Sequence, residues 1–273
     1  MILTTTQSWS QTIDSLANYS EEAKDTFRLA DLVNSYREKA LAGDAQSQYN
    51  LGLCYQYGEG VEKDQAQAIE WFLKAAAQNH AASQCSLGLC YQYEYGIKKD
   101  MRQALKWYDK AARQNYAMAQ YCLGLCYNYG DGVPLDTRKA VEWYRRAANQ
   151  GLHLAQLNLG MCYYEGEGVP RNYIQAVEWI RKAADQGYAH AQYNLGYCYY
   201  TGKGVKKDLK QAAEWYQKSA EQGYVEAQVS LGACYEDGEG VEKDIDKAVE
   251  WYTLAANQGN EAAQEALKEL GVE

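Results

Sequence analysis

Apolar and small residues recur along this chain with a constant step of 36 positions. Leu-Gly pairs begin at residues 51, 87, 123, 159, 195 and 231, and tryptophan stands at 71, 107, 143, 179, 215 and 251. Cysteine follows the same step from residue 54, and tyrosine from residue 55. Six repeats without insertion or deletion therefore fill 45–260, in the ranges 45–80, 81–116, 117–152, 153–188, 189–224 and 225–260. Such a period predicts a tandem-repeat protein and not two globular domains.

Each repeat has the pattern of two helices joined by a glycine turn. In the first repeat, small and apolar residues keep helical spacing from Ala45 to about Tyr57, and Gly58 offers the left-handed conformation that ends a helix. Asp64 then stands where an N-cap acceptor is wanted, and an Asp or Asn holds that place in every later repeat. A second apolar stripe around Trp71 follows it. The pattern predicts short helices that pack in pairs and stack on one another.

The fourth repeat illustrates the motif. It reads Ala155-Gln156-Leu157-Asn158-Leu159-Gly160, then Tyr163, Gly166-Glu167-Gly168-Val169, Ala176-Val177-Glu178-Trp179 and Lys182-Ala183-Ala184-Asp185-Gln186-Gly187. This motif closely resembles the Sel1-like repeat, a relative of the tetratricopeptide repeat with a slightly longer unit. The resemblance implies an all-α fold, a right-handed α-solenoid (superhelix) of antiparallel helix pairs. Two departures stand out: Glu94 replaces a loop glycine, and Ile180 replaces the usual tyrosine after the tryptophan, which we expect to be conservative for packing.

The segments outside the six repeats are expected to cap the stack, because a terminal repeat otherwise exposes its stacking face. Residues 1–44 are predicted to be N-terminal capping helices. The second helix of a degenerate repeat is marked by Leu32, Val33, Tyr36, Lys39, Ala40 and Gly43, and a further short helix by Trp9, Ile13, Leu16 and Tyr19. Residues 261–273 are predicted to be a C-terminal capping helix, with Leu267 and Leu270 covering the last repeat.

Composition excludes several classes of protein. The chain of 273 residues carries 27 Lys and Arg against 36 Asp and Glu, a net charge of −9, and has no basic block. Nucleic acids and anionic membrane surfaces need clustered cations, so neither is expected as a partner. No apolar run approaches the roughly 18 residues that span a bilayer, and the start of the chain lacks the segments of a signal peptide. We therefore expect a cytoplasmic protein, or one delivered by a specialised secretion system.

Cysteine and histidine indicate no catalytic or metal chemistry. Six of the 8 cysteines share one repeat position, and stacked helices lie roughly 8–10 Å apart, beyond the ~7 Å between Cα atoms that a disulfide tolerates. We expect buried, reduced thiols in a reducing compartment. His80, His153 and His190 lie in separate repeats without partners at metal-ligand spacing. No cofactor is expected, and no enzyme activity, because the repeat brings no serine, histidine and carboxylate together.

Positions that vary between repeats yet stay apolar or aromatic are free to serve a partner. On each first helix they run at i, i+3, i+7, i+10 and i+11, the stripe that lines the concave binding surface of the tetratricopeptide-type solenoids that this repeat resembles. Nine tyrosines fall on it, here called the tyrosine stripe: Tyr49, Tyr57, Tyr93, Tyr121, Tyr129, Tyr164, Tyr193, Tyr197 and Tyr200. Tyrosine supplies a large rigid contact with one hydrogen-bonding end, which is typical of interface cores.

These residues predict a protein–protein interaction scaffold or adaptor, a monomer that binds a protein or peptide segment in a tyrosine-rich groove. In the last repeat, Glu236 and Asp237 favour a basic group of that segment. The resemblance implies bacterial signalling or host-interaction proteins. Exposure is expected at the outer helix ends, at Tyr57, Tyr93, Tyr129, Tyr164 and Tyr200.

Three alternatives stay open. The stripe can pack on the next repeat, above all at Leu53, Leu89, Leu125 and Met161. The protein can be a hydrolase or binder of cell-wall, β-lactam-like ligands, as some cysteine-rich relatives are. It can also be a structural protein that self-associates through the stripe.

Overall fold

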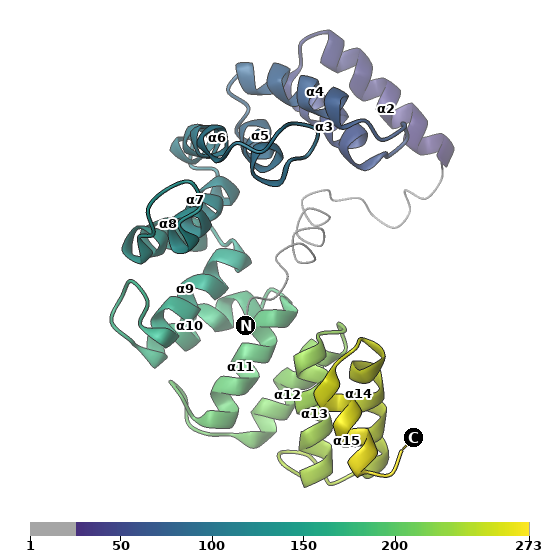
Figure 1. Cartoon of the computed structure of the whole chain (residues 1–273), viewed down its shortest axis with the longest axis vertical. Helices are drawn as coiled ribbons and strands as arrows, with labels where there is room; N and C mark the ends of the chain where they lie inside the picture. Colours follow the sequence, from purple (N-terminus) through teal and green to yellow (C-terminus); the bar gives the residue numbers. More distant parts are fainter. Residues whose placement is uncertain (1–25, 273) are drawn as a thin grey trace. The chain divides into compact units, whose positions relative to one another are not determined.

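The computed structural model describes residues 26–272, and this part of the chain consists of α-helices joined by turns, with no strand (Figure 1). The helices are α2 (Thr26–Leu41), α3 (Ala45–Tyr57), α4 (Gln65–Ala77), α5 (Ala81–Tyr93), α6 (Met101–Arg113), α7 (Ala117–Tyr129), α8 (Thr137–Asn149), α9 (His153–Glu165), α10 (Tyr173–Ala184), α11 (Ala189–Thr201), α12 (Leu209–Ala220), α13 (Val225–Asp237), α14 (Ile245–Asn257) and α15 (Glu261–Glu269). The predicted short helix marked by Trp9, Ile13, Leu16 and Tyr19 lies outside the described residues.

The chain divides into two compact units, an N-terminal unit of Met1–Gln114 and a C-terminal unit of Asn115–Glu273. In the N-terminal unit, α3 pairs with α4 and α5 with α6, and α2 packs on α3. In the C-terminal unit, α7 pairs with α8, α9 with α10, α11 with α12 and α13 with α14, and α15 packs on α14 (Figure 1). Each repeat thus forms one helix pair, which confirms the predicted all-α stack of helix pairs.

Recurring caps fix the ends of the helices. Before α8, the Asp136 carboxylate accepts a hydrogen bond from the backbone N–H of Lys139 at 3.0 Å, which satisfies a donor of the first turn. Each first helix ends in a left-handed residue, usually a glycine such as Gly130, with a φ of 73°. Glu94 takes the same conformation with a φ of 62°, and its N–H still bonds to the Cys90 carbonyl. The loop that departs from the motif therefore keeps the turn, although left-handed backbone strains a residue that has a Cβ.

The glycine of each Leu-Gly pair lets the two helices of a repeat approach closely. A Cβ built on Gly124 would lie 2.5 Å from the Tyr144 ring, so only hydrogen fits there. Tyr144 is fully buried over the first helix as a result. In the fourth repeat Ile180 takes this place against Gly160 and is also buried, as expected for an exchange that preserves core packing.

A buried glutamine that the sequence pattern had not singled out links neighbouring repeats. Gln156 donates from Nε2 to the carbonyl of Ala148 in the preceding repeat at 3.2 Å. Its Oε1 accepts a hydrogen bond from Gln186 Nε2, at the end of α10, at 2.7 Å. Gln156 therefore satisfies both ends of its amide inside the stack, as a buried polar side chain must.

The tryptophans also belong to the stack. Trp215 packs against the core that α9, α10 and α11 share, and Trp251 against the core of α12 and α13. A cation one turn later covers most of these rings, as Lys182 Nζ does at 3.8 Å from the centre of Trp179. The tryptophan column thus serves packing between repeats, with its outer face shielded by Lys or Arg.

All eight cysteines are buried, and none forms a disulfide. Burial raises the pKa of Cys90 and Cys162 to about 12 and that of Cys198 to about 11. These thiols stay protonated at neutral pH and act as small hydrophobic side chains. Among residues 26–272, no group of three or more His, Cys, Asp or Glu side chains is placed to hold a metal ion.

None of the described helices combines the length and the apolar character that crossing a membrane requires.

Candidate functional site

Three members of the tyrosine stripe lie in the seams between helices. The Tyr193 ring lies 5.7 Å from that of Tyr216 in the second helix of its repeat, and its hydroxyl bonds to Ser230 in the next repeat. Tyr121 is buried at 8% exposure in the equivalent place, and burial raises the pKa of its hydroxyl. Tyr49 is half-buried, with its pKa raised to about 12 by burial. At this position packing on the stack takes most of the ring surface.

The outer helix ends differ from the expected uniform exposure. Tyr129 is 63% exposed at the end of α7, whereas Tyr164 is only 8% exposed. The reason is register: Tyr164 and Tyr200 stand one residue earlier in their repeats than Tyr129, and one residue turns a side chain by about 100° around a helix. Tyr164 is therefore directed toward its partner helix, and the prediction that it is exposed is wrong.

The other outer tyrosines are half-buried, and they are Tyr57, Tyr93 and Tyr200. Of the positions expected to pack, Leu53, Leu89, Leu125 and Met161 are also half-buried. In the same stripe Tyr197 replaces these aliphatic residues and keeps 39% of its surface exposed. Tyr129 and Tyr197 are thus the most open members of the tyrosine stripe in the C-terminal unit.

The two acidic residues predicted beside the stripe in the last repeat, Glu236 and Asp237, differ in exposure. Glu236 is half-buried, and its Oε2 accepts a hydrogen bond from the Tyr252 hydroxyl at 2.8 Å. Asp237, at the end of α13, is exposed. Glu239 in the following turn bonds to Tyr200, which raises the pKa of that tyrosine. The carboxylates of Glu236, Asp237 and Glu239 therefore lie next to the tyrosine stripe. Of the two that were predicted, Asp237 is more accessible than Glu236.

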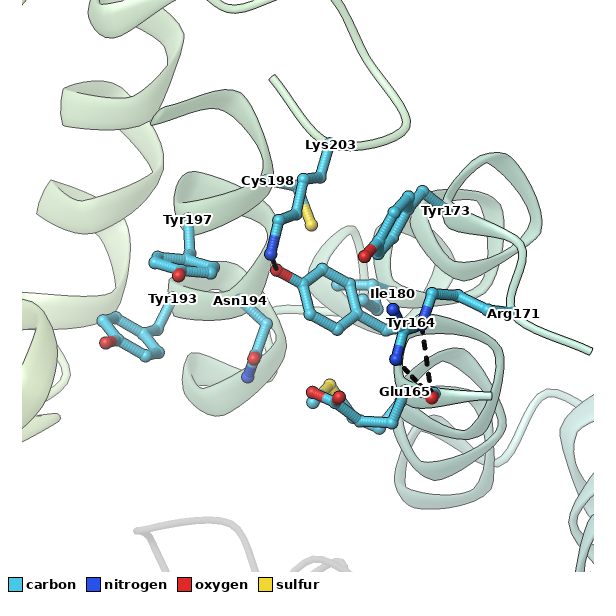
Figure 2. Close-up of a pocket in the computed structure, with 11 residues that line it drawn as sticks. Tyr164, Glu165, Arg171, Tyr173, Ile180, Tyr193, Asn194, Tyr197, Cys198 and Lys203 are labelled. Carbon is cyan, nitrogen blue, oxygen red and sulfur yellow. Dashed lines mark hydrogen bonds between the residues drawn. The ribbon is translucent and has the colours of Figure 1, made fainter. Parts of the chain in front are cut away.

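Three stripe tyrosines meet in one pocket of about 410 Å³ between the fourth and fifth repeats (Figure 2). Tyr164 and Ile180 line it from α9 and α10, and Tyr197 lines it from α11. The other lining residues are Met161, Glu165, Arg171, Tyr173, Tyr193, Asn194, Cys198 and Lys203. The pocket is thus aromatic on its walls and charged at its edge.

A lysine of the loop after α11 reaches across this pocket. Lys203 Nζ donates a hydrogen bond to the Tyr164 hydroxyl at 3.0 Å, and Figure 2 shows its ammonium directed at that oxygen. The same ammonium lies 4.9 Å from the centre of the Tyr164 ring and 5.5 Å from that of Tyr173. These contacts hold a cation inside an aromatic frame.

Protonation favours binding over catalysis in this pocket. The hydrogen bond to Tyr164 raises the pKa of the Lys203 ammonium, so the amine carries its proton at neutral pH. Burial raises the pKa of the Tyr164 hydroxyl and, to about 11, that of the Cys198 thiol. An activated nucleophile needs a lowered pKa or a free base beside it, and these three groups show neither. They present a cation and hydrogen-bond donors.

The predicted tyrosine stripe includes Tyr164, Tyr193 and Tyr197 of this pocket, but the prediction did not include Tyr173, Lys203, Arg171 or Asn194. Arg171 did not stand out in the sequence, because a basic residue precedes most second helices at the same repeat position. Its guanidinium donates a hydrogen bond to the Glu165 carbonyl at 3.2 Å. Lys203 carried a signal, because the same repeat position is acidic in four other repeats.

Six copies of the Sel1 repeat match the chain, over residues 45–80, 81–116, 117–152, 153–188, 189–224 and 225–260. The chain belongs to the Sel1 repeat family. Sel1 repeat proteins generally are non-enzymatic scaffolds that mediate protein–protein interactions. No curated protein matches the chain.

Several solved structures share this architecture. A protective antigen of uropathogenic Escherichia coli strains, with an SLR fold, is 39% identical with a TM-score of 0.78 over 85% of this chain, which spans 50% of that protein's length. A Sel1 repeat protein from Oxalobacter formigenes is 33% identical with a TM-score of 0.78, over 86% of this chain and 99% of that one. An immunity protein from Pseudomonas aeruginosa shares the fold at 22% identity and a TM-score of 0.51, over 78% of this chain and 81% of its own.

Proposed function

We propose that this Sel1 repeat protein is an interaction scaffold, and that its C-terminal unit binds an extended segment of a partner protein along the first helices α7, α9, α11 and α13. The observation that carries the proposal is the pocket at α9 and α11, which opens beside the exposed ring of Tyr197. Exposed tyrosines around a recess can anchor a partner with little loss of side-chain entropy.

Acidic residues at one end of the proposed binding surface determine which part of the partner segment binds there. Asp237 is exposed and Glu236 and Glu239 lie near it, so the segment carries a basic group where it passes α13. Replacing Asp237 with Lys should weaken binding and reduce its dependence on salt, because one attractive pair is lost.

The biological setting follows the family resemblance. We propose a role in bacterial signalling or host interaction, with a protein partner and with the scaffold acting as a monomer. Light scattering after size exclusion separates this monomer from a self-associating structural protein: a mass near 30.8 kDa is expected at all concentrations tested. A concentration-dependent rise in mass would support the structural role instead.

The test of the proposed function compares matched surface variants. A partner is captured by cross-linking from the native lysate, purified, and titrated calorimetrically against wild type and the Tyr129→Ala, Tyr197→Ala double variant. Loss of two interface tyrosines should weaken binding by about tenfold or more. Leu135→Ala and Ile174→Ala are the controls, because both side chains are 64% exposed and both lie off the tyrosine stripe. Equal weakening by both sets would contradict the proposed surface.

A further inference from the structure

The pocket at α9 and α11 lies where two departures from the repeat meet. Lys203 occupies a loop position that is otherwise acidic or aromatic: Glu59, Tyr95, Asp131, Glu167 and Glu239. Ile180 occupies a second-helix position that is otherwise aromatic: Phe72, Tyr108, Tyr144, Tyr216 and Tyr252. The two departing residues come from different repeats, yet both line the same recess. A change that served only packing would have no reason to coincide with a charge reversal.

The presence of isoleucine instead of tyrosine at position 180 explains why this repeat has room for a pocket. In other repeats the tyrosine at this place extends its hydroxyl to the first helix: Tyr108 donates to Gln92 at 2.6 Å, and Tyr252 donates to Glu236 at 2.8 Å. The matching first-helix residue of the fourth repeat is Tyr164, which lines the pocket. Ile180 ends short of it, so the volume that a phenol fills elsewhere contributes to the recess.

The presence of lysine at position 203, where most repeats have an acidic residue, explains the positive charge of the pocket. Within residues 26–272, no carboxylate lies within the 4.0 Å of the Lys203 ammonium that an ion pair requires. The charged lining residues are Lys203, Arg171 and Glu165, two cations against one carboxylate. The pocket therefore carries one net positive charge in a chain whose net charge is −9.

We propose that this pocket receives the carboxylate side chain of an Asp or Glu in the bound partner segment, an inference that rests on the proposed function. The Lys203 ammonium pairs with the carboxylate, and the Tyr164, Tyr173 and Tyr197 rings cover the methylene groups behind it. A single excess positive charge matches a carboxylate monoanion. A phosphate dianion is matched better by several Arg side chains that can bond in pairs, and Arg171 is already bonded to the Glu165 carbonyl.

The repeat itself supplies variants that are expected to fold. Lys203→Glu restores the residue of the first, fourth and sixth repeats, and Ile180→Tyr restores that of the second, third, fifth and sixth. Ile180→Tyr is expected to fill the pocket, and Lys203→Glu to reverse its charge. The fifth repeat already holds a tyrosine at both Tyr200 and Tyr216, the equivalents of positions 164 and 180, so both rings fit in one repeat.

The probe is a phage-displayed library of random peptides, selected separately on the full wild-type chain and on each variant. Wild type should select peptides with an acidic residue fixed at one position. Changing that Glu to Gln in a synthetic peptide should weaken binding about tenfold, as measured by fluorescence anisotropy, because a charge-assisted hydrogen bond is lost. Ile180→Tyr should abolish the preference, and Lys203→Glu should exchange it for Lys or Arg. Circular dichroism and thermal unfolding confirm that the variants are folded.

The other outcomes of this selection distinguish failure of the carboxylate pocket from failure of the proposed scaffold function. Peptides selected by wild type without an acidic preference, and bound equally by Ile180→Tyr, would overturn the carboxylate pocket and leave the scaffold function standing. A phosphoserine peptide that binds more tightly than its Glu counterpart would overturn it in favour of phosphate. Failure to select any peptide would contradict the proposed function, and with it the inference that rests on it.

Discussion

Gln186 Nε2 donates a hydrogen bond to Gln156 Oε1 at 2.7 Å, and the same contact joins the two helices of every repeat. The first-helix glutamine is buried at 5% exposure, while its partner at the end of the second helix is exposed. The pair fixes the amide orientation that lets Gln156 bond to Ala148 of the preceding repeat. One side chain thus couples packing within a repeat to stacking between repeats.

Removing the buried glutamine should therefore cost more than removing its partner. Gln156→Ala removes both hydrogen bonds of the glutamine and leaves a small void, while the Ala148 carbonyl keeps the Gly151 N–H at 3.0 Å, so we expect about 2 kcal/mol loss of unfolding free energy. Gln186→Ala should cost about 1 kcal/mol, because Gln156 Oε1 then lies near solvent. Urea titration followed by circular dichroism measures both changes. Equal effects would show that the hydrogen bond across repeats contributes nothing.

The strained loop at Glu94 offers a stabilising change. Glu94→Gly should raise stability by about 1 kcal/mol, because glycine adopts the φ of 62° without steric strain. Gly130→Glu is the matched control in the next repeat: its φ of 73° makes the same demand, and a Cβ there meets only ordinary contacts. That variant should be destabilised by a similar amount. Thermal unfolding compares the two, and a shift of the same sign in both would contradict the explanation.

The cysteine column predicts low thiol reactivity in the folded chain. Burial raises the pKa of Cys90 to about 12 and that of Cys234 to about 11, so thiolate is scarce and reagents have no access. Ellman's reagent at pH 8 should label the native protein slowly, and all 8 thiols should react at once in guanidinium chloride. Rapid labelling of the native chain would show that these cysteines are not the packing residues that the structure describes.

Three histidines predict how stability depends on pH, and burial lowers the pKa of His190 as it does that of the other two. Partial burial lowers the pKa of His80 and of His153 below the usual 6.5, so at slightly acidic pH the unfolded chain binds more protons than the folded chain. The unfolding free energy should therefore fall as pH drops below 6.5. His80 also caps α5, since its Nδ1 accepts from the Ser83 N–H at 3.3 Å, and protonation removes this acceptor.

A double variant removes the contributions of His80 and His153 and leaves that of His190. His80→Asn keeps a capping acceptor and His153→Gln keeps a polar side chain, and neither replacement titrates. Urea midpoints between pH 7.5 and 5 should decline less steeply in the double variant than in wild type. Identical slopes would assign the loss of stability to other groups.

Much of the fold could be predicted from the sequence, because the period of 36 aligns every helix start and end with its five counterparts. Asp136 and Gly130 cap helices through contacts with residues a few positions away, so their roles can be predicted without knowing the tertiary structure. The burial of Tyr164 was not predicted, although the sequence places it one residue earlier in its repeat than Tyr129, because both were treated as one outer helix position. The glutamine pair was missed because its members stand 30 residues apart in each repeat, and only stacking shows that they meet.

The pocket illustrates the same limit. Ile180 and Lys203 each depart visibly from the repeat, but the repeat pattern does not show that both line one recess. The interpretation of Ile180 as a conservative packing exchange holds for the core, where it is buried, and misses the space that the shorter side chain leaves.

Hydroxyl-radical footprinting of the full chain with a saturating peptide from the wild-type selection tests the binding surface most directly. Tyr129 and Tyr197 on the first helices should lose most of their oxidation on binding, because their exposed rings become covered. Trp179 and Trp215 on the second helices are internal controls and should be oxidised at an unchanged rate. Protection of the tryptophans with no change at Tyr129 and Tyr197 would contradict the account, because the partner would then bind the second helices.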